Sequence, residues 1–258
     1  MTAYSSPRRR WPFLDWPHPI PFAHRGGAEE WPENTMLAFS SAVRLGYRYL
    51  ETDVHATSDG VLLAFHDHDL DRVTDRRGRL SELPFSEVRL ARVEGEPIPL
   101  LEDLLGVWPD IRVSIDAKHE AAVPPLVAAL ERTRAHSRVC VGAFSNRRVD
   151  HIRRLSGGDV CTWMGSSEIL RLRLASLGLP TPAFAASCTQ VPVRHGPVPL
   201  VDRRFIDEAH RRGVAVHVWT IDDRAEMTRL LNLGVDGILS DRPSVLKDVF
   251  VERGIWAL

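Results

Sequence analysis

Residues 20–24 (IPFAH) and 49–55 (YLETDVH) frame the stretch that decides the fold of this chain. Both runs are short and rich in residues that favour β-strands. Between them, residues 34–46 follow Pro32 with the pattern of an amphipathic helix that stops at Gly46. A strand, a helix and a second strand in this order form a βαβ unit, in which the two strands run parallel.

The same alternation of short strands and amphipathic helices continues to the end of the chain. Six further strands are expected at residues 113–116, 139–144, 160–163, 184–187, 214–219 and 237–239. The helices that fit between and after them are expected at residues 124–135, 147–155, 167–177, 202–212, 223–233 and 244–253. This succession of strands and helices predicts an α/β fold, a single (β/α)8 TIM barrel.

One segment interrupts the alternation. Residues 57–109 are too long for a simple crossover between two strands. They contain a predicted strand at residues 61–66, which follows the turn signal Asp59-Gly60. We therefore predict a small insertion after the second strand of the barrel, at about residues 57–109.

The first residues of the chain do not fit the barrel pattern. The basic triplet Arg8–Arg10 does not predict an export signal, because two prolines and an acidic residue follow it where a continuous apolar core is required. We predict that residues 1–18 form a flexible N-terminal arm and that residues 19–258 form the barrel domain.

The composition is that of an ordinary globular protein, with 44% hydrophobic and 26% charged residues in a chain of 258. The net charge of -1 provides no field that would attract nucleic acid or an anionic membrane. No apolar run approaches the ~18 residues of a membrane span, so stable membrane insertion is not expected. Cys140, Cys161 and Cys188 fall in short apolar runs without zinc-like spacing. Their odd number argues against a disulfide framework and favours a reducing compartment, so we predict a cytoplasmic protein.

Polar side chains gather where the predicted strands end. Glu51 and Asp53 are two residues apart in an extended strand, so they share a face and can aim at one cation. Asp116 ends the next predicted barrel strand. The alternative is a solvated strand end, because carboxylates are usually exposed. We favour metal ligation, and the oxygen ligands predict a hard divalent cation, Mg²⁺ or Ca²⁺.

Histidines and cations near these carboxylates complete an inventory suited to phosphate chemistry. An imidazole can take or give a proton near neutral pH, and His24 and His66 lie close to the acidic positions in the sequence. Arg25 offers a planar fork for phosphate oxygens. Lys118 shares a face with Asp116 and would neutralise phosphate charge, the alternative being an ordinary surface lysine. Trp219 ends a strand at the same edge of the barrel, where it forms either core or a wall for the substrate.

The order of short motifs around these residues resembles that of the glycerophosphodiester phosphodiesterase family. The motifs are HRG at 24–26, PENT at 32–35, ETDV at 51–54, TSDG at 57–60, HD at 66–67, LDRVT at 70–74, IPLLE at 98–102, IDAK at 115–118, VWT at 218–220 and GVDGILSD at 234–241. Each string is short, but the ordered set is specific. Only the first two dozen residues and residues 145–200 fall outside it.

The resemblance implies a phosphoric diester hydrolase with a TIM barrel and a small insertion on its catalytic face. The reaction would be the metal-dependent hydrolysis of a small glycerophosphodiester to sn-glycerol 3-phosphate and an alcohol. His24 and His66 would be the acid–base pair, with Arg25, Lys118 and Trp219 binding the substrate. The glycerol 2-hydroxyl would attack phosphorus to give a cyclic phosphate that water then opens.

Several points stay open. Asp116 departs from the family, which more often has glutamate there, although the related sphingomyelinase D enzymes have aspartate at the comparable place. A lysophospholipase D or sphingomyelinase D-like enzyme is a second candidate and would need a broad apolar mouth. A catalytically silent barrel that binds phosphodiesters is a third, but every expected histidine and carboxylate position is filled. Which histidine is the acid, and the oligomeric state, are not decided by the sequence.

Overall fold

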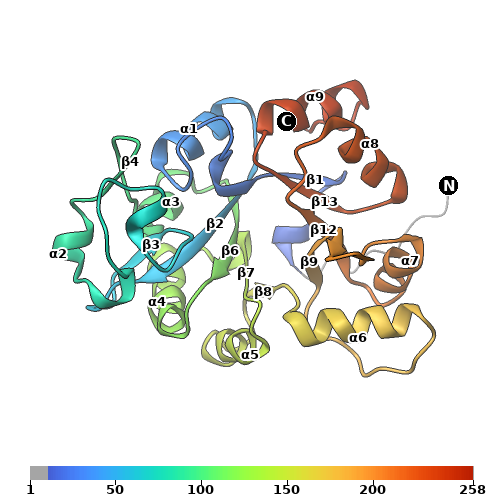
Figure 1. Ribbon diagram of the computed structural model, residues 1–258. Coiled ribbons are helices and arrows are strands. Elements are labelled where there is room, and N and C mark those ends of the chain that lie inside the picture. Colours follow the sequence, from blue (N-terminus) through green and yellow to red (C-terminus); the bar gives the residue numbers. More distant parts are fainter. Residues whose placement is uncertain (1–10, 258) are drawn as a thin grey trace.

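Eight parallel strands form a barrel in the structure of this protein, a computed structural model that describes residues 11–257 (Figure 1). In chain order the strands are β1 (Ile20–Ala23), β2 (Tyr49–Ala56), β6 (Arg112–Ala117), β7 (Val139–Gly142), β8 (Cys161–Thr162), β9 (Cys188–Pro192), β12 (Ala215–Trp219) and β13 (Gly237–Ser240). Each strand lies beside its neighbours in the chain, and β1 also pairs with β13. A single parallel bridge between Trp163 and Cys188 links β8 to β9, so the barrel is nearly closed. The predicted barrel is confirmed.

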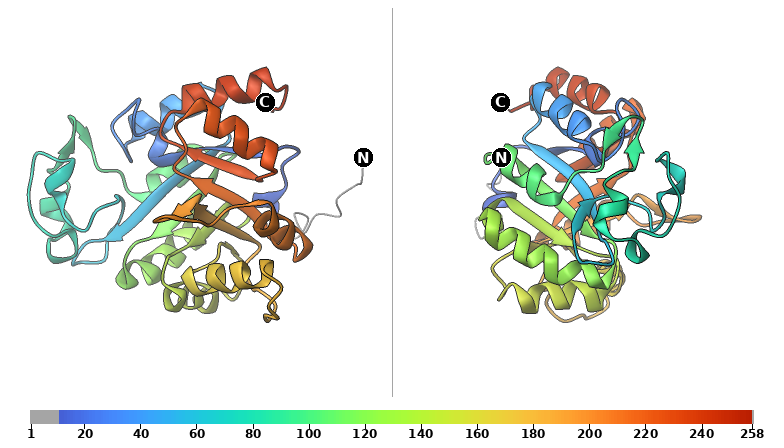
Figure 2. Two further views of the ribbon diagram at one scale, coloured as in Figure 1. Left: turned by 45° about the vertical axis from the view of Figure 1, so that its right-hand side comes forward. Right: turned by 90° about the vertical axis from the view of Figure 1, so that its left-hand side faces the viewer.

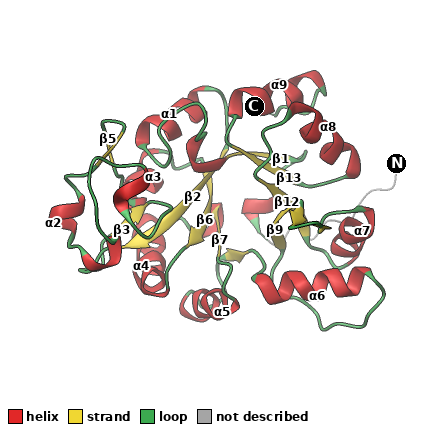
Figure 3. Cartoon of the chain, viewed as in Figure 1, coloured by secondary structure: helices red, strands yellow, loops and turns green. Residues whose placement is uncertain are grey.

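Helices surround the strands (Figure 3). They are α1 (Met36–Arg44), α3 (Leu101–Val107), α4 (Val123–Thr133), α5 (Asn146–Leu155), α6 (Ser166–Ser176), α7 (Arg203–Arg211), α8 (Arg224–Leu233) and α9 (Pro243–Glu252). Side chains of Thr35, Asp202 and Asp223 accept backbone N–H groups at the starts of α1, α7 and α8, which satisfies donors that have no partner within the helix. Within residues 11–257, no helix has the length and apolar character that crossing a membrane requires.

Two elements differ from the sequence-based expectation. The strand expected at residues 184–187 is instead β9, which begins at Cys188 and ends at Pro192. Pro192 is tolerated because it is the last residue of the strand, where a missing N–H costs little. The helix α3 falls inside the range expected for the insertion. Its residues Leu101, Leu104 and Leu105 nevertheless pack in the main hydrophobic core, so α3 belongs to the barrel.

The insertion is a small lobe that continues from the end of β2. β3 (Leu62–Ala64) pairs antiparallel with the end of β2, and the short helix α2 (Phe85–Val88) and the two-stranded pair β4 (Arg92–Val93) and β5 (Glu96–Pro97) follow. The lobe has its own apolar cluster. Figure 2 shows it projecting beyond the barrel on the side where β2 ends. It therefore lies at the carboxyl end of the strands, where (β/α)8 barrels carry their active sites.

Residues 1–18 were expected to form a flexible arm. This prediction is wrong for the segment around Phe13 and Leu14, which packs against the barrel. Residues 1–10 lie outside the described residues. The 3-10 turn η2 (Pro12–Leu14) buries Phe13 and Leu14 at the amino end of the barrel. The Tyr49 hydroxyl donates a hydrogen bond to the Phe13 carbonyl at 2.6 Å, and the Phe13 and Tyr49 rings meet edge to face at 5.3 Å. Burial of Phe13 and Leu14 at the amino end of the barrel stabilises the fold, because it removes their apolar surface from water.

We predict that Phe13→Ala lowers the free energy of unfolding by about 3 kcal/mol, because it empties a buried aromatic site. Asp15→Ala is the matched control, since Asp15 lies two residues away with an exposed side chain, and it should change stability by less than about 0.5 kcal/mol. Urea denaturation of both variants measures the difference. Equal free energies of unfolding for the two variants would mean that this segment is an arm that does not pack against the barrel.

Candidate active site

A sharp turn after β1 places the first predicted site residues. The 3-10 turn η3 (His24–Gly26) has Arg25 at a φ of 52°, and Gly26 and Gly27 follow with φ of 83° and 110°. A Cβ on Gly26 would lie 2.7 Å from the Cβ of Ala38, so that position has no room for a side chain. These glycines let the chain turn against α1, and the turn aims His24 and Arg25 over the end of the barrel.

Three carboxylates lie on two neighbouring strands. Glu51 and Asp53 are on β2, Asp116 is on β6, and Asp53 stands opposite Asp116 in the parallel register. All three are buried. Burial, together with the adjacent Asp53 carboxylate, raises the pKa of Glu51 to about 7. Burial also raises the pKa of Asp116 above its ordinary value. The fold therefore buries three carboxylates close together, and this burial is costly unless positive side chains lie beside them.

Lys118 and Arg25 supply this positive charge. The Lys118 ammonium lies 2.8 Å from a carboxylate oxygen of Asp53 and 2.8 Å from one of Asp116. Arg25 Nε lies 3.3 Å from Asp53, and the Arg25 backbone N–H donates to Glu51 at 3.1 Å. Although burial opposes it, these two cations lower the pKa of Asp53 to about 2. Lys118 thus occupies the space between two of the predicted metal ligands.

The fit of the three carboxylates to a metal ion is partial in this arrangement. Within residues 11–257, Glu51, Asp53 and Asp116 do not each bring an oxygen within 4.8 Å of the others. One oxygen of Asp116, however, is buried without a hydrogen-bond partner. The donor chemistry suits a hard cation, and such a cation would have to displace the Lys118 ammonium from between Asp53 and Asp116.

Each predicted catalytic histidine is held by a carboxylate through its Nδ1 atom. His24 Nδ1 lies 2.6 Å from Asp241, and His66 Nδ1 lies 2.5 Å from Asp67. The Nε2 atom of His24 lies 3.7 Å from Glu51. Hydrogen bonding at Nδ1 leaves Nε2 as the atom that can exchange a proton with a bound molecule.

The surroundings shift the two histidines in opposite directions. Burial acts to lower the pKa of His24, but the carboxylates of Glu51 and Asp241 outweigh it and raise the pKa above its ordinary value. Burial lowers the pKa of His66 below its ordinary value even though Asp53 and Asp67 act to raise it. The site thus treats its two imidazoles differently.

A chain of ion pairs ties the insertion to the barrel. Arg72 binds Glu33 through two hydrogen bonds of 2.9 and 2.7 Å, and it also pairs with Asp67 at 2.5 Å. Glu33 in turn accepts a hydrogen bond from Arg25 at 3.1 Å. The loop that carries His66 is thereby connected to the turn that carries Arg25.

All eight predicted site residues line one cavity of about 140 Å³. They are His24, Arg25, Glu51, Asp53, His66, Asp116, Lys118 and Trp219. The structure therefore brings together every side chain that the sequence singled out for the site; the role of each stays a prediction.

Several residues that complete the site were not predicted from the sequence. Phe144 is 48% exposed and meets the Trp219 ring edge to face at 5.8 Å, and Trp163 lines the same wall. Asp241 and Asp67, which hold the histidines, were contained in the quoted GVDGILSD and HD motifs but received no catalytic role. The aromatic wall had no local signal, because Phe144 follows β7, Trp163 follows β8 and Trp219 ends β12.

Comparison with known proteins identifies relatives over nearly the whole chain. The model of the "Glycerophosphoryl diester phosphodiesterase family" matches residues 24–245. A "Probable glycerophosphodiester phosphodiesterase 2" of Mycobacterium tuberculosis is 40% identical over 245 residues and covers 92% of both chains. "Lysophospholipase D GDPD1" of Homo sapiens is 26% identical and covers 88% of this chain and 84% of its own.

Solved structures share the fold at lower identity. A putative glycerophosphoryl diester phosphodiesterase from Silicibacter pomeroyi has a TM-score of 0.81 at 20% identity and covers 98% of this chain and 100% of its own. An Oleispira antarctica phosphodiesterase, solved in complex with the product sn-glycerol-3-phosphate, has a TM-score of 0.77 at 21% identity and covers 91% and 97%. These likenesses support the barrel described above.

We predict that Lys118→Met lowers the free energy of unfolding by about 3 kcal/mol, because it leaves Asp53 and Asp116 buried without their shared cation. Mg²⁺ or Ca²⁺ should restore stability in this variant more than in the unchanged protein. Differential scanning fluorimetry at several cation concentrations measures both effects.

Lys247→Met is the matched control for this experiment. Lys247 is also half-buried, but its ammonium donates to the backbone carbonyl of Leu45. Cation should stabilise the control no more than it stabilises the unchanged protein. An equal cation response in the two variants would mean that the carboxylates do not depend on Lys118 for neutralisation.

Proposed function

The chain belongs to the glycerophosphoryl diester phosphodiesterase family, and we propose that its active site hydrolyses small glycerophosphodiesters to sn-glycerol 3-phosphate and an alcohol with the help of a divalent cation. One observation carries the proposal. Two histidines, each anchored at Nδ1 by a carboxylate, line one cavity together with Arg25 and Lys118. Such a cavity offers two proton-exchange groups and two phosphate-binding cations in one place.

The cation would be held by Glu51, Asp53 and Asp116. When bound, a hard divalent cation polarises phosphoryl oxygens and stabilises negative charge that develops on them. Its charge would also replace the neutralising role of Lys118 and Arg25 toward the carboxylates. We infer that these two side chains then become available to the phosphate, since both are already in the cavity.

The protein's own residues support attack by a hydroxyl of the substrate. With the phosphate held by Arg25 and Lys118, one histidine takes the proton of the glycerol 2-hydroxyl and the other gives a proton to the departing alkoxide. Attack within one molecule has a large advantage in effective concentration over attack by water. The product of this step is a cyclic phosphate, which water opens.

A substrate analogue without the 2-hydroxyl should bind but react far more slowly; turnover near the normal rate would rule out the cyclic route.

The aromatic wall provides an apolar surface against which the glycerol backbone of a substrate can pack. Trp219 and Phe144 present apolar surface beside the polar half of the cavity. A lysophospholipase D activity is the second candidate, because Phe144 extends this apolar surface to the solvent. The apolar side chains that line the cavity are few, Phe144, Trp163, Trp219 and Leu239, which favours the compact substrate over a lipid with a long acyl chain.

We predict that purified protein hydrolyses glycerophosphocholine and glycerophosphoethanolamine, that exhaustive chelation abolishes the activity, and that Mg²⁺ or Ca²⁺ restores it. The reason is that buried carboxylates and phosphate oxygens both need the cation's charge. A lysophospholipid assayed in parallel distinguishes the second candidate. Full activity after chelation would refute the metal requirement, and no hydrolysis of any substrate with either cation would support the catalytically silent barrel.

We predict that Asp67→Asn lowers kcat at least about tenfold with a small change in KM, because His66 loses the carboxylate that orients it and supports its positive charge. Asp69→Asn is the matched control, since Asp69 is a neighbour with a half-exposed side chain that pairs with Arg79 at 3.4 Å. Steady-state kinetics on glycerophosphocholine measures both variants. If the two variants have the same kcat, Asp67 does not position the catalytic imidazole.

A further inference from the structure

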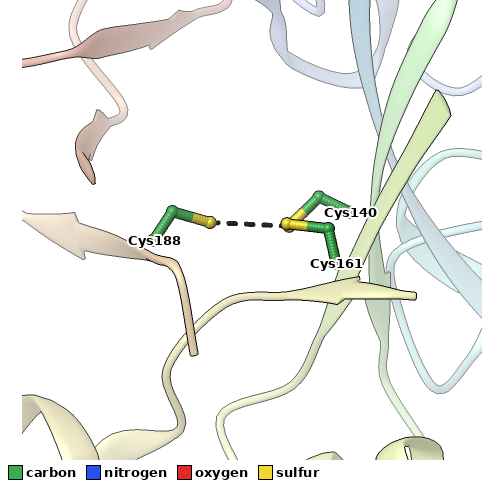
Figure 4. A group of neighbouring side chains, drawn as sticks. All are labelled: Cys140, Cys161 and Cys188. Atoms are coloured by element: carbon green, nitrogen blue, oxygen red, sulfur yellow. Dashed lines mark hydrogen bonds between the residues drawn. The ribbon is translucent and has the colours of Figure 1, made fainter. Parts of the chain in front are cut away.

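Three cysteines that the proposed reaction does not use meet inside the barrel. Cys140 is on β7, Cys161 on β8 and Cys188 on β9, so they come from three successive strands. All three are buried, free thiols. Figure 4 shows their sulfur atoms pointing toward one another across the barrel interior. Their spacing in the sequence is not zinc-like, because the barrel, and not a local turn, brings these residues together.

The distances between the sulfurs suit a single metal ion. The three Sγ atoms all lie within 4.8 Å of one another, and those of Cys140 and Cys188 are 3.5 Å apart. Two sulfurs that each lie about 2.3 Å from one ion can be at most about 4.6 Å apart. The cluster therefore needs little or no rearrangement to hold an ion between its three sulfurs.

The Cys140 and Cys188 thiols form a hydrogen bond to each other, and binding of a metal ion would remove their protons. The thiolate is the form of cysteine that binds metals.

The cluster is separate from the carboxylate site. The cysteines pack with Phe13, Phe22 and Ala215 in the apolar cluster at the amino end of the barrel. Trp163 belongs to this cluster and also lines the active-site cavity, so its indole lies between the two regions. The sulfurs are soft ligands beside this apolar cluster, with His217 and Asp236 near Cys188. The carboxylates Glu51, Asp53 and Asp116 are hard ligands at the opposite end.

We propose that Cys140, Cys161 and Cys188 form a binding site for one soft, thiophilic metal ion, with Cu⁺ as the ion that the site matches. Each thiol that becomes a ligand releases its proton to solvent, and the oxidation states of copper and sulfur do not change. This site does not depend on the proposed phosphodiesterase reaction.

The number of ligands selects the ion. Soft thiolates bind Cu⁺ and Zn²⁺, but structural zinc sites are almost always four-coordinate. Among residues 11–257, the group of ligand atoms within 4.8 Å contains the three sulfurs and no fourth histidine nitrogen or carboxylate oxygen. Three sulfurs therefore fit Cu⁺ better than they fit zinc.

Anaerobic titration of the reduced, folded protein with Cu⁺ in the presence of a chromophoric Cu⁺ chelator tests the proposal. The protein should take one Cu⁺ per chain from the chelator, gain ultraviolet thiolate-to-copper absorbance, and melt at a higher temperature. Cys161→Ser should weaken binding by about 100-fold or more, a loss at least as large as that caused by removing a supporting residue around a metal.

Ser187→Ala is the matched control, because Ser187 is next to Cys188 but has no thiol. Its hydroxyl accepts a hydrogen bond from Trp11 Nε1. It should bind Cu⁺ as the unchanged protein does. Cys161→Ala replaces Cys161→Ser if the hydroxyl is not tolerated in the core, with circular dichroism to verify folding. Retention of Cu⁺ by the chelator, equal binding by the cysteine variant, or binding only after unfolding in urea would each overturn the proposal.

Discussion

Burial of three carboxylates at the ends of two adjacent strands is the constraint on which the rest of the active site depends. Carboxylates removed from water are costly unless cations and hydrogen-bond donors surround them. Lys118 bridges Asp53 and Asp116, and Arg25 contacts Asp53. Arg25 reaches this position only because the turn after β1 takes positive φ values. The glycine-rich turn and the buried charge therefore depend on each other.

The same charge network organises the insertion. Glu33 links Arg25 to Arg72, and Arg72 holds Asp67 beside His66. Positioning of a histidine from the insertion thus follows from the placement of charge on the barrel. The opposite end of the barrel is stabilised differently, by Phe13, Tyr49 and other apolar residues. One end is arranged for chemistry and the other for packing, as is usual in (β/α)8 barrels.

The features predicted from sequence are those with a local pattern. Alternating strands and helices predicted the barrel, and the parity of Glu51 and Asp53 on one strand predicted their shared face. Lys118 was expected to bind phosphate, but its bridge between Asp53 and Asp116 depends on the register of β2 and β6. The cysteine cluster likewise depends on strand neighbours far apart in sequence. Residues 11–16 were missed because prolines obscure the pattern of apolar residues that pack.

A crystal structure with sn-glycerol 3-phosphate and Mg²⁺ or Ca²⁺ would show how the buried carboxylates and cations share the bound phosphate. We predict a cation on oxygens of Glu51, Asp53 and Asp116, and a phosphate bound by Arg25 and Lys118 between the two histidines. We also predict that the Lys118 ammonium has left at least one of the carboxylates that it contacts at 2.8 Å. A phosphate bound outside this cavity, with Lys118 still bridging Asp53 and Asp116, would contradict this arrangement.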